Sequence, residues 1–268
     1  MEYPIKRVNN DKSLRCLIEN YQITILNPCR RGKKLLVLDI DHTLSDHTTS
    51  EDPMRPYLHE FLSVTYAKYD IIIWSASRMK KIKSKLEQLG VINSPNYNIV
   101  TLLDRKAMLM TSNIIKDRDS GRSFTTCKPL HLIWAKFPEF YDPRNTIMVD
   151  DMEKNFKMNP QNGLTIKAFW KHNYANDEEL CKLAQYLLAI SELDDLSSLD
   201  HKCWEKYLTK VTQKGNILPS YPKTCPTCFS TTNNNKIGRI LKNLYTKVFL
   251  CFPWFIVHLC PCIVTKER

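Results

Sequence analysis

Glycine is scarce in this chain, with 6 residues among 268, against 14 prolines. No GxGxxG or GxxxxGK[ST] segment occurs, so the glycine-rich loops that hold dinucleotides or nucleotide phosphates are missing. The sequence therefore argues against an ordinary kinase or dehydrogenase. The overall composition, 43% hydrophobic and 25% charged, is typical of a folded globular protein.

A basic stripe with interleaved exposed aromatic residues, as nucleic-acid binding would need, is also missing. The formal net charge is +11, but much of it lies in residues 211–268, which hold eight Lys and Arg and one Glu. The basic run at residues 78–83 has the spacing of a solvated helix face. We therefore expect no direct contact with nucleic acid.

No signal peptide is evident in residues 1–14, which carry charges and no apolar run. We therefore expect the ten cysteines to be reduced thiols. Five of them crowd into residues 211–268, where CPTC at 225–228 and CPC at 260–262 match a four-cysteine zinc site only weakly. Residues 248–264 are at the lower limit for a membrane span, and two prolines and a histidine count against one. A poorly ordered extension is the main interpretation, and membrane contact is the alternative.

Apolar runs are few and short, and they alternate with segments of helical periodicity. The runs are continuous, which indicates strands buried on both faces of a parallel sheet. The predicted strands are residues 33–40, 71–74, 99–103 and 146–149. The predicted helices are residues 11–19, 56–69, 79–89, 130–137, 177–190 and 199–210. This alternation predicts an α/β fold, Rossmann-like, with helices on both faces of a central parallel sheet.

The predicted domain covers residues 21–210, after a lead-in at residues 1–20 and before the extension at residues 211–268. Residues 104–127 are less regular and predict a small β-hairpin insertion. No segment between the strands has room for a large cap domain. Enzymes that enclose small metabolites generally need a lid to exclude water, so an open crevice favours a phosphate presented on a protein.

Several polar side chains come directly after the predicted strands, at the edge of the sheet where ligands bind in this fold class. Three or four carboxylates, two hydroxyls and one ammonium could therefore converge on one crevice, a set that suits phosphoryl transfer. These residues are Asp39, Asp41, Thr43, Ser75, Lys128, Asp150 and Asp151. The same patterns recur at Asp117–Asp119 and Asp194–Asp195, but in a turn and at a polar helix end, so the strand context carries the prediction.

Each chemical requirement of phosphomonoester cleavage has a candidate among these residues. Asp39 ends the first buried strand and is the predicted nucleophile, which would form an aspartyl-phosphate. Asp41, two residues on, is the predicted acid and base. Mg²⁺ prefers carboxylate oxygens, which Asp39 offers together with Asp150 or Asp151, and either of the two could be the direct ligand.

Three further residues are predicted to hold the phosphoryl group. Thr43 and Ser75 can donate hydrogen bonds to its oxygens, and Lys128 supplies a compact positive charge. Taken singly, Ser75 could instead cap the following helix and Lys128 could be solvated. Their order and their placement at strand ends favour the phosphate site.

The sequence resembles the FCP/SCP branch of the haloacid dehalogenase superfamily, the RNA polymerase II C-terminal-domain (CTD) phosphatases. The resemblance covers about residues 20–210 and rests on five segments in particular. These are KKLLVLDIDHTL at 33–44, MRPYLHEFL at 54–62, IWSA at 73–76, KPL at 128–130 and NTIMVDD at 145–151.

The resemblance implies Mg²⁺-dependent hydrolysis of phosphoserine or phosphothreonine in a phosphorylated protein, with the backbone carbonyl of Asp41 as a further metal ligand. The implied substrates are the polymerase CTD or a proteasome subunit, and the implied location is the nucleus, with the cytoplasm as a second compartment. The closest members carry a ubiquitin-like domain that docks on the proteasome, and no such domain is evident before residue 20. His42 and Ser45 depart from the aromatic and bulky apolar residues usual in relatives, so we expect different packing beside the nucleophile, Asp39.

The main hypothesis is therefore a monomeric protein serine/threonine phosphatase. Two alternatives remain open at this point. One is a catalytically weak module that binds phosphoproteins, and the other is a small-molecule phosphatase of the same superfamily.

Overall fold

The computed structural model describes residues 12–48, 53–113 and 123–213 of the chain. The predicted extension at residues 211–268 lies almost wholly outside this part, as do its cysteine pairs, residues 248–264 and the turn at 117–121. The five cysteines within the described part are free thiols. None of the described helices combines the length and the apolar character that a membrane crossing requires.

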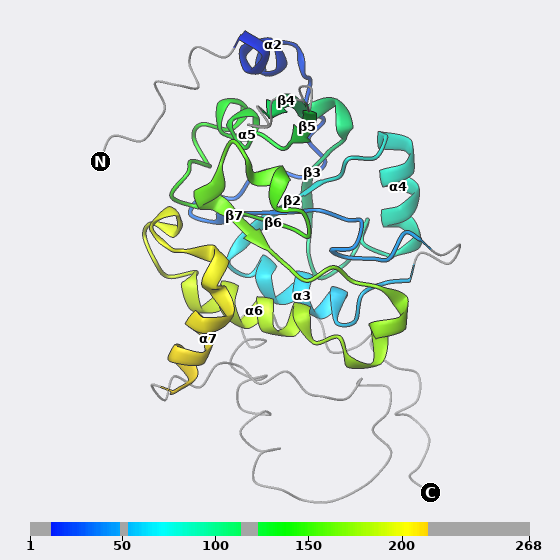
Figure 1. The fold of residues 1–268 in the computed structure, drawn as a ribbon, viewed down its shortest axis with the longest axis vertical. Coiled ribbons are helices and arrows are strands. Elements are labelled where there is room, and N and C mark those ends of the chain that lie inside the picture. The colour runs from blue at the N-terminus through cyan, green and yellow to red at the C-terminus, as the bar shows by residue number, and fades with distance from the viewer. Residues whose placement is uncertain (1–11, 49–52, 114–122, 214–268) are drawn as a thin grey trace, which may run out of the picture. The chain divides into compact units, whose positions relative to one another are not determined.

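A five-stranded parallel sheet forms the centre of the fold (Figure 1). Its strands are β1 (Lys34–Leu38), β2 (Tyr69–Trp74), β3 (Ile99–Leu103), β6 (Thr146–Asp150) and β7 (Gly163–Thr165). They lie in the order β3-β2-β1-β6-β7, so β1 is the central strand. The chain adds β2 and β3 on one side of β1, and β6 and β7 on the other side. Every residue of β2, β3 and β6 is buried, which explains their unbroken apolar runs.

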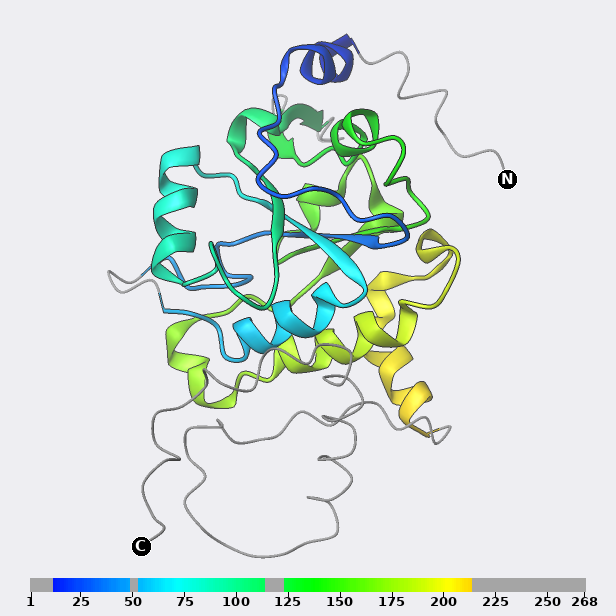
Figure 2. The same ribbon diagram turned by 180° about the vertical axis from the view of Figure 1, so that it is seen from behind.

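Helices cover both faces of this sheet, as the sequence predicts. The helices are α2 (Lys12–Asn20), α3 (Leu58–Tyr66), α4 (Met79–Gln88), α5 (His131–Lys136), α6 (Glu179–Ile190) and α7 (Trp204–Gln213). Figures 1 and 2 show α3 and α6 on one side of the sheet and α5 on the other. On the α5 side, Leu132 and Ile133 belong to the same buried apolar cluster as Leu35 and Val37 of β1. The buried apolar faces of sheet and helices are the main stabilising contribution to such a fold.

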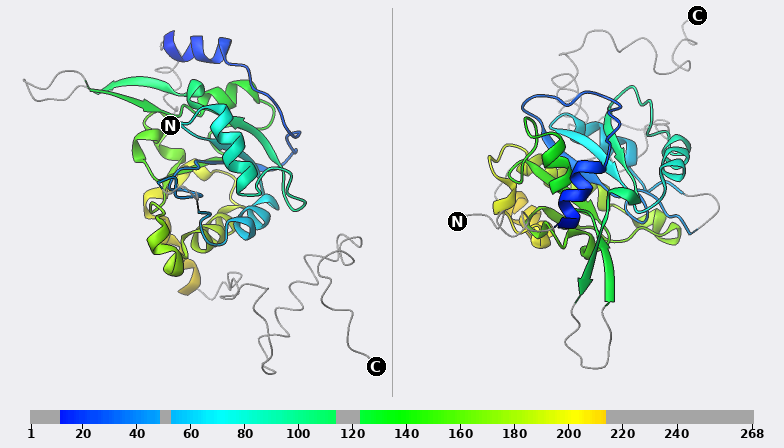
Figure 3. Two further views of the ribbon diagram at one scale, coloured as in Figure 1. Left: turned by 90° about the vertical axis from the view of Figure 1, so that its right-hand side faces the viewer. Right: turned by 90° about the horizontal axis from the view of Figure 1, so that it is seen from above.

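The predicted hairpin is present as a separate two-stranded sheet. Strands β4 (Leu109–Asn113) and β5 (Ser123–Cys127) pair antiparallel, with Leu109 opposite Cys127. Figure 3 shows this hairpin projecting from the main sheet. The hairpin also brings the chain back to the sheet edge, because Lys128 follows β5 directly.

Several predicted boundaries were wrong by a few residues, for local reasons. Helix α3 ends at Tyr66 rather than at residue 69, because Tyr69 is already the first residue of β2. Strand β6 extends to Asp150, one residue beyond the prediction. The helix expected at residues 199–210 is a 3₁₀ turn, His201–Cys203, followed by α7. Short polar elements such as these carry little periodic signal.

Strand β7 was missing from the prediction because it has three residues and an atypical sequence. Its first residue, Gly163, lies against the ring of Phe156, and a Cβ at this position would come within 2.2 Å of a ring carbon. Glycine is therefore required for this close approach. A strand that begins with glycine is poorly recognised from strand propensity.

Candidate active site

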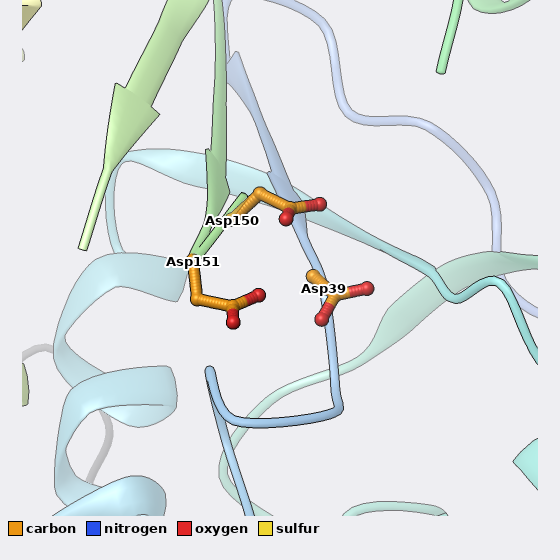
Figure 4. Close-up of side chains that lie close together, drawn as sticks. All are labelled: Asp39, Asp150 and Asp151. Atoms are coloured by element: carbon orange, nitrogen blue, oxygen red, sulfur yellow. The ribbon is translucent and has the colours of Figure 1, made fainter. Parts of the chain in front are cut away.

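The carboxyl ends of three neighbouring strands bring the predicted acidic residues together. Asp39 follows β1, Ser75 follows β2, and Asp150 is the last residue of β6. The parallel register places Leu38 of β1 beside both Ile73 of β2 and Val149 of β6, so the residues after them share one edge. Figure 4 shows the side chains of Asp39, Asp150 and Asp151 lying close together.

Lys128, the residue directly after β5, contacts two of these carboxylates. Its Nζ lies 2.5 Å from Oδ1 of Asp39 and 2.6 Å from Oδ2 of Asp150. The side chain is 1% exposed, so the ammonium is removed from water and paired on two sides. Burial lowers the pKa of Lys128, but the two carboxylates outweigh burial and raise it, which keeps the side chain charged.

The two adjacent aspartates of this motif have different surroundings. Asp150 is fully buried, and its oxygens accept hydrogen bonds from Lys128, from Nδ2 of Asn155 at 2.8 Å and from the backbone N–H of Met152 at 2.9 Å. Asp151 is partly exposed, and within residues 12–48, 53–113 and 123–213 no other residue donates to its carboxylate. Asp150 is therefore committed to holding Lys128, while Asp151 keeps its oxygens for a ligand.

The site fits a divalent cation on its donor chemistry. Asp39, Asp150 and Asp151 each offer a carboxylate oxygen, and these oxygens lie within 4.8 Å of one another. Burial and the neighbouring carboxylate of Asp150 raise the pKa of Asp151 to about 6, and burial likewise raises the pKa of Asp39, although Lys128 opposes it. Such mutual repulsion among carboxylates is relieved by a cation with oxygen ligands, as Mg²⁺ is. Asp39 and Asp151 would hold it, with Asp150 behind them.

Asp41 lies beside this cluster in a separate network of donors. Its Oδ1 accepts a hydrogen bond from Nζ of Lys85 at 2.9 Å, and its Oδ2 lies 3.4 Å from the hydroxyls of both Ser75 and Ser77. Burial alone would raise the pKa of Asp41, but Lys85, helped by the charges of His47 and Lys81, holds it below its ordinary value. The carboxylate is therefore ionised in the free protein.

Ser75 does not cap helix α4, which was one interpretation of the sequence. The residue before α4 is Arg78, and no side chain caps it. Instead, Oγ of Ser75 accepts the backbone N–H of Ser77 at 3.1 Å and faces Asp41. Ser75 therefore belongs to the site.

The loop after β1 is a tight turn that holds Thr43 inside the protein. The carbonyl of Ile40 accepts the N–H groups of Thr43, Leu44 and Ser45 at 3.2, 2.8 and 3.1 Å. Thr43 is fully buried, and its hydroxyl has no hydrogen-bond partner among the described residues. A buried hydroxyl without a partner is a candidate donor to a bound anion.

Arg55 holds the loop after β1 in place. Its guanidinium is fully buried, donates to the carbonyl of Thr43 at 3.0 Å, and forms two bonds of 3.0 and 2.9 Å to the carboxylate of Asp177. A third contact joins it to the carbonyl of Lys167 at 2.9 Å. Bidentate pairing of this kind gives a rigid geometry.

His42 and Ser45 both lie in the turn after β1. His42 adopts a left-handed conformation with φ of 60°, and its ring centroid lies 4.4 Å from that of His47 and 4.1 Å from that of Trp170. Its Nδ1 lies 3.0 Å from the carbonyl of Phe169. Ser45 is buried, and its hydroxyl has no partner in the described part of the chain. His42 thus forms an aromatic cluster beside the acidic residues.

The structure places four further residues around the site that the sequence did not reveal. Lys85 and Ser77 contact Asp41, Asn155 contacts Asp150, and Arg55 holds the carbonyl of Thr43. Arg55 lies in a segment that carries the family resemblance, so that signal was available. Lys85 had no such signal, because it is one of many lysines on a helix and only its burial distinguishes it.

Comparisons with known proteins point to a phosphatase family. The family model of NLI interacting factor-like phosphatases matches residues 34–197. The chain is 56% identical over 208 residues to the ubiquitin-like domain-containing CTD phosphatase of Arabidopsis thaliana, and 51% identical over 199 residues to the ubiquitin-like domain-containing CTD phosphatase 1 of Homo sapiens. These matches cover 75% and 72% of the chain and confirm the resemblance to CTD phosphatases.

The matched regions make up a smaller share of the relatives' own lengths. The chain spans 59% of the Arabidopsis protein and 61% of the human protein. Among solved structures, that of Fcp1, an essential RNA polymerase II CTD phosphatase, matches with a TM-score of 0.42 and 13% identity, over 78% of this chain and 70% of that one.

Proposed function

The chain belongs to the NLI interacting factor-like phosphatase family, and from this we propose that it is a Mg²⁺-dependent phosphatase that removes phosphate from serine or threonine of proteins. One observation carries the proposal: Lys128 is buried between Asp39 and Asp150, and the carboxylate of Asp151 lies in the same cluster. A nucleophilic carboxylate, a fixed cation and a second carboxylate for proton transfer are what phosphomonoester cleavage needs.

Asp39 is the proposed nucleophile. Lys128 holds its Oδ1 at 2.5 Å, whereas within the described residues no donor contacts Oδ2. In the first step, Oδ2 forms a bond to phosphorus while the bond between phosphorus and the serine oxygen breaks, which gives an aspartyl-phosphate. Lys128, together with the hydroxyls of Thr43 and Ser75, offsets the negative charge on the phosphoryl oxygens.

Asp41 is the proposed acid and base. The dianionic phosphate of a bound substrate raises the pKa of a neighbouring carboxyl, so Asp41 takes up a proton on binding and donates it to the departing serine oxygen. In the second step, Asp41 accepts a proton from the attacking water, which releases inorganic phosphate and restores Asp39. A bound Mg²⁺, held by Asp39, Asp151 and the backbone carbonyl of Asp41, would offset the charge of the anionic nucleophile and of the phosphate.

We propose a protein substrate, in the first place a phosphoserine of the RNA polymerase II CTD. The relatives at 56% and 51% identity are named as CTD phosphatases, and this supports the choice. Between the strands, the described residues contain short helices and a hairpin rather than a large cap domain, which favours a segment of protein as the substrate. Proteasome subunits are the second substrate class, and nuclear residence is proposed with the first; a fluorescent fusion tests the location.

Phosphate release from a phosphoserine peptide of CTD sequence by the full chain, with Mg²⁺ or with EDTA, tests the proposal. We expect release that depends on Mg²⁺ and is abolished by Asp39→Asn. Asp194→Asn is the matched control, because Asp194 is an exposed carboxylate of the second Asp-Asp pair. No release by the folded wild type would refute the proposal in favour of a phosphopeptide-binding module. Faster release from phosphorylated metabolites would favour a small-molecule phosphatase.

A further inference from the structure

A basic groove lies on helix α4, beside the candidate active site. It has a volume of about 390 Å³ and is lined by Arg78, Lys80, Lys81, Ser84, Lys85 and Gln88. We call it the α4 groove. The basic side chains of residues 78–83 are exposed, in agreement with the solvated helix face that the sequence predicted. Three of them, together with Lys85, also line this concave surface.

The α4 groove is continuous with the catalytic machinery through Lys85. This side chain is 3% exposed, lines the groove, and donates to Oδ1 of Asp41 at 2.9 Å. The charge of Lys81, one turn away on the same face, also acts on Asp41. An anion in the groove would therefore lie next to the residue that transfers protons to the substrate.

The outer basic side chains of the groove have no anionic partner in the described part of the chain. Arg78, Lys80 and Lys81 are exposed and form no ion pair there. Elsewhere on the same protein, surface lysines are paired, as in the contacts of Lys68 with Glu192 at 2.7 Å and of Lys202 with Glu153 at 2.5 Å. Like charges three and four positions apart on a helix destabilise it, so this concentration of positive charge is unfavourable until an anion binds.

The geometry of the helix sets the distance to such an anion. A helix rises about 1.5 Å per residue, so Lys81 lies about 6 Å, and Arg78 about 10 Å, along the axis from Lys85. An extended peptide rises about 3.3 Å per residue. A substrate segment leading away from Asp41 would thus reach these side chains two or three residues from the phosphoserine that is cleaved.

We propose that the α4 groove binds a second phosphate of the same substrate, carried two or three residues from the scissile phosphoserine. The inference rests on the proposed function, because it takes that phosphoserine as the group at Asp39. Arg78 offers two parallel N–H donors to a phosphate and Lys81 a compact charge, and a phosphate dianion matches both. The groove thereby selects doubly phosphorylated segments over singly phosphorylated ones.

The experiment compares two peptides on the full chain, one with a single phosphoserine and one with a second phosphoserine three residues away. The ratio of their kcat/KM values measures the preference for the second phosphate. We expect the preference to fall about tenfold in Arg78→Gln/Lys81→Gln. Lys83→Gln is the matched control, because Lys83 is an exposed lysine of the same helix outside the groove. The preference should also weaken as salt rises.

Binding of the same peptides to the wild type in EDTA, followed by fluorescence anisotropy, separates this inference from the proposed function. A preference for the doubly phosphorylated peptide that is lost in Arg78→Gln/Lys81→Gln supports the groove, even if no peptide is hydrolysed. Equal affinities and equal kcat/KM for the two peptides, or equal effects of the groove variant on both, would overturn it. Phosphate release without such a preference would leave the proposed phosphatase intact.

Discussion

Asp150 and Asp151 are adjacent carboxylates in unlike surroundings, so Asp→Asn has different consequences at the two positions. At position 150, three donors point at a fully buried carboxylate, and an asparagine offers one acceptor oxygen and a donor in its place. At least one buried donor then faces another donor, and Lys128 loses one of its two anions. Breaking a buried charge pair in this way costs about 3–5 kcal/mol of the free energy of unfolding.

At position 151 the same change should leave stability nearly intact. Asp151 is partly exposed, and its removal relieves repulsion within a group of carboxylates whose ligand oxygens lie within 4.8 Å of one another. The loss falls on metal binding instead. Removing groups that only support metal ligands costs about 10- to 100-fold in affinity, so loss of a direct carboxylate ligand should raise the Mg²⁺ concentration at half-maximal activity at least tenfold.

Two measurements on the pair of variants decide the assignment. Urea unfolding in EDTA, followed by circular dichroism, should show a large loss for Asp150→Asn and a loss below about 1 kcal/mol for Asp151→Asn. Mg²⁺ titration of phosphate release should show the shifted requirement for Asp151→Asn, with Asp194→Asn as the surface control. If Asp150→Asn is as stable as the wild type, or if only Asp150→Asn shifts the Mg²⁺ requirement, the division of roles is refuted.

Three other residues near the site give further predictions. Arg55→Met should lose about 3–5 kcal/mol of unfolding free energy in urea, and Arg55→Met/Asp177→Asn should lose less than the sum of the two single changes, since each leaves a buried charge alone. Burial would raise the pKa of Asp46, but hydrogen bonds from the side chain of Thr48 and from backbone N–H groups lower it to about 2. Ionised Asp46 therefore stabilises the fold above the pKa that it has in the unfolded chain, and this stabilisation is lost as pH falls toward 2. Asp46→Asn should lower the free energy of unfolding by about 2 kcal/mol at pH 7 and by less at pH 3. An equal loss at the two pH values would contradict this. Lys85→Met should raise the pKa of Asp41 and move to higher pH whichever limb of the kcat profile reports that pKa, and Lys85→Arg should restore it; an unmoved profile in Lys85→Met would exclude a role in setting the pKa of Asp41.

Much of the fold was predictable, because the physical signals are local. Strands buried on both faces need continuous apolar runs, and the predicted runs are β1, β2, β3 and β6 of the sheet. Gly90, the residue after the predicted helix at 79–89, has the positive φ of 66° that ends a helix. By contrast, β7 and the 3₁₀ turns were missing or misplaced, since elements of three to six residues have too few positions to show a period.

The amino-acid sequence by itself determined the parallel sheet, the strand ends and the identity of the acidic residues there. Only the tertiary structure decided what each of them does with its neighbours. Lys128 reaches Asp39 across 89 residues of chain, and Arg55 reaches Asp177 across 122. Lys85 is a further example. In the sequence it is one of several lysines on a helix, and only the packing of the folded chain brings it into contact with Asp41. Strand positions follow from apolar periodicity along the chain, whereas the pairing of buried charges depends on which distant segments the folded core brings together.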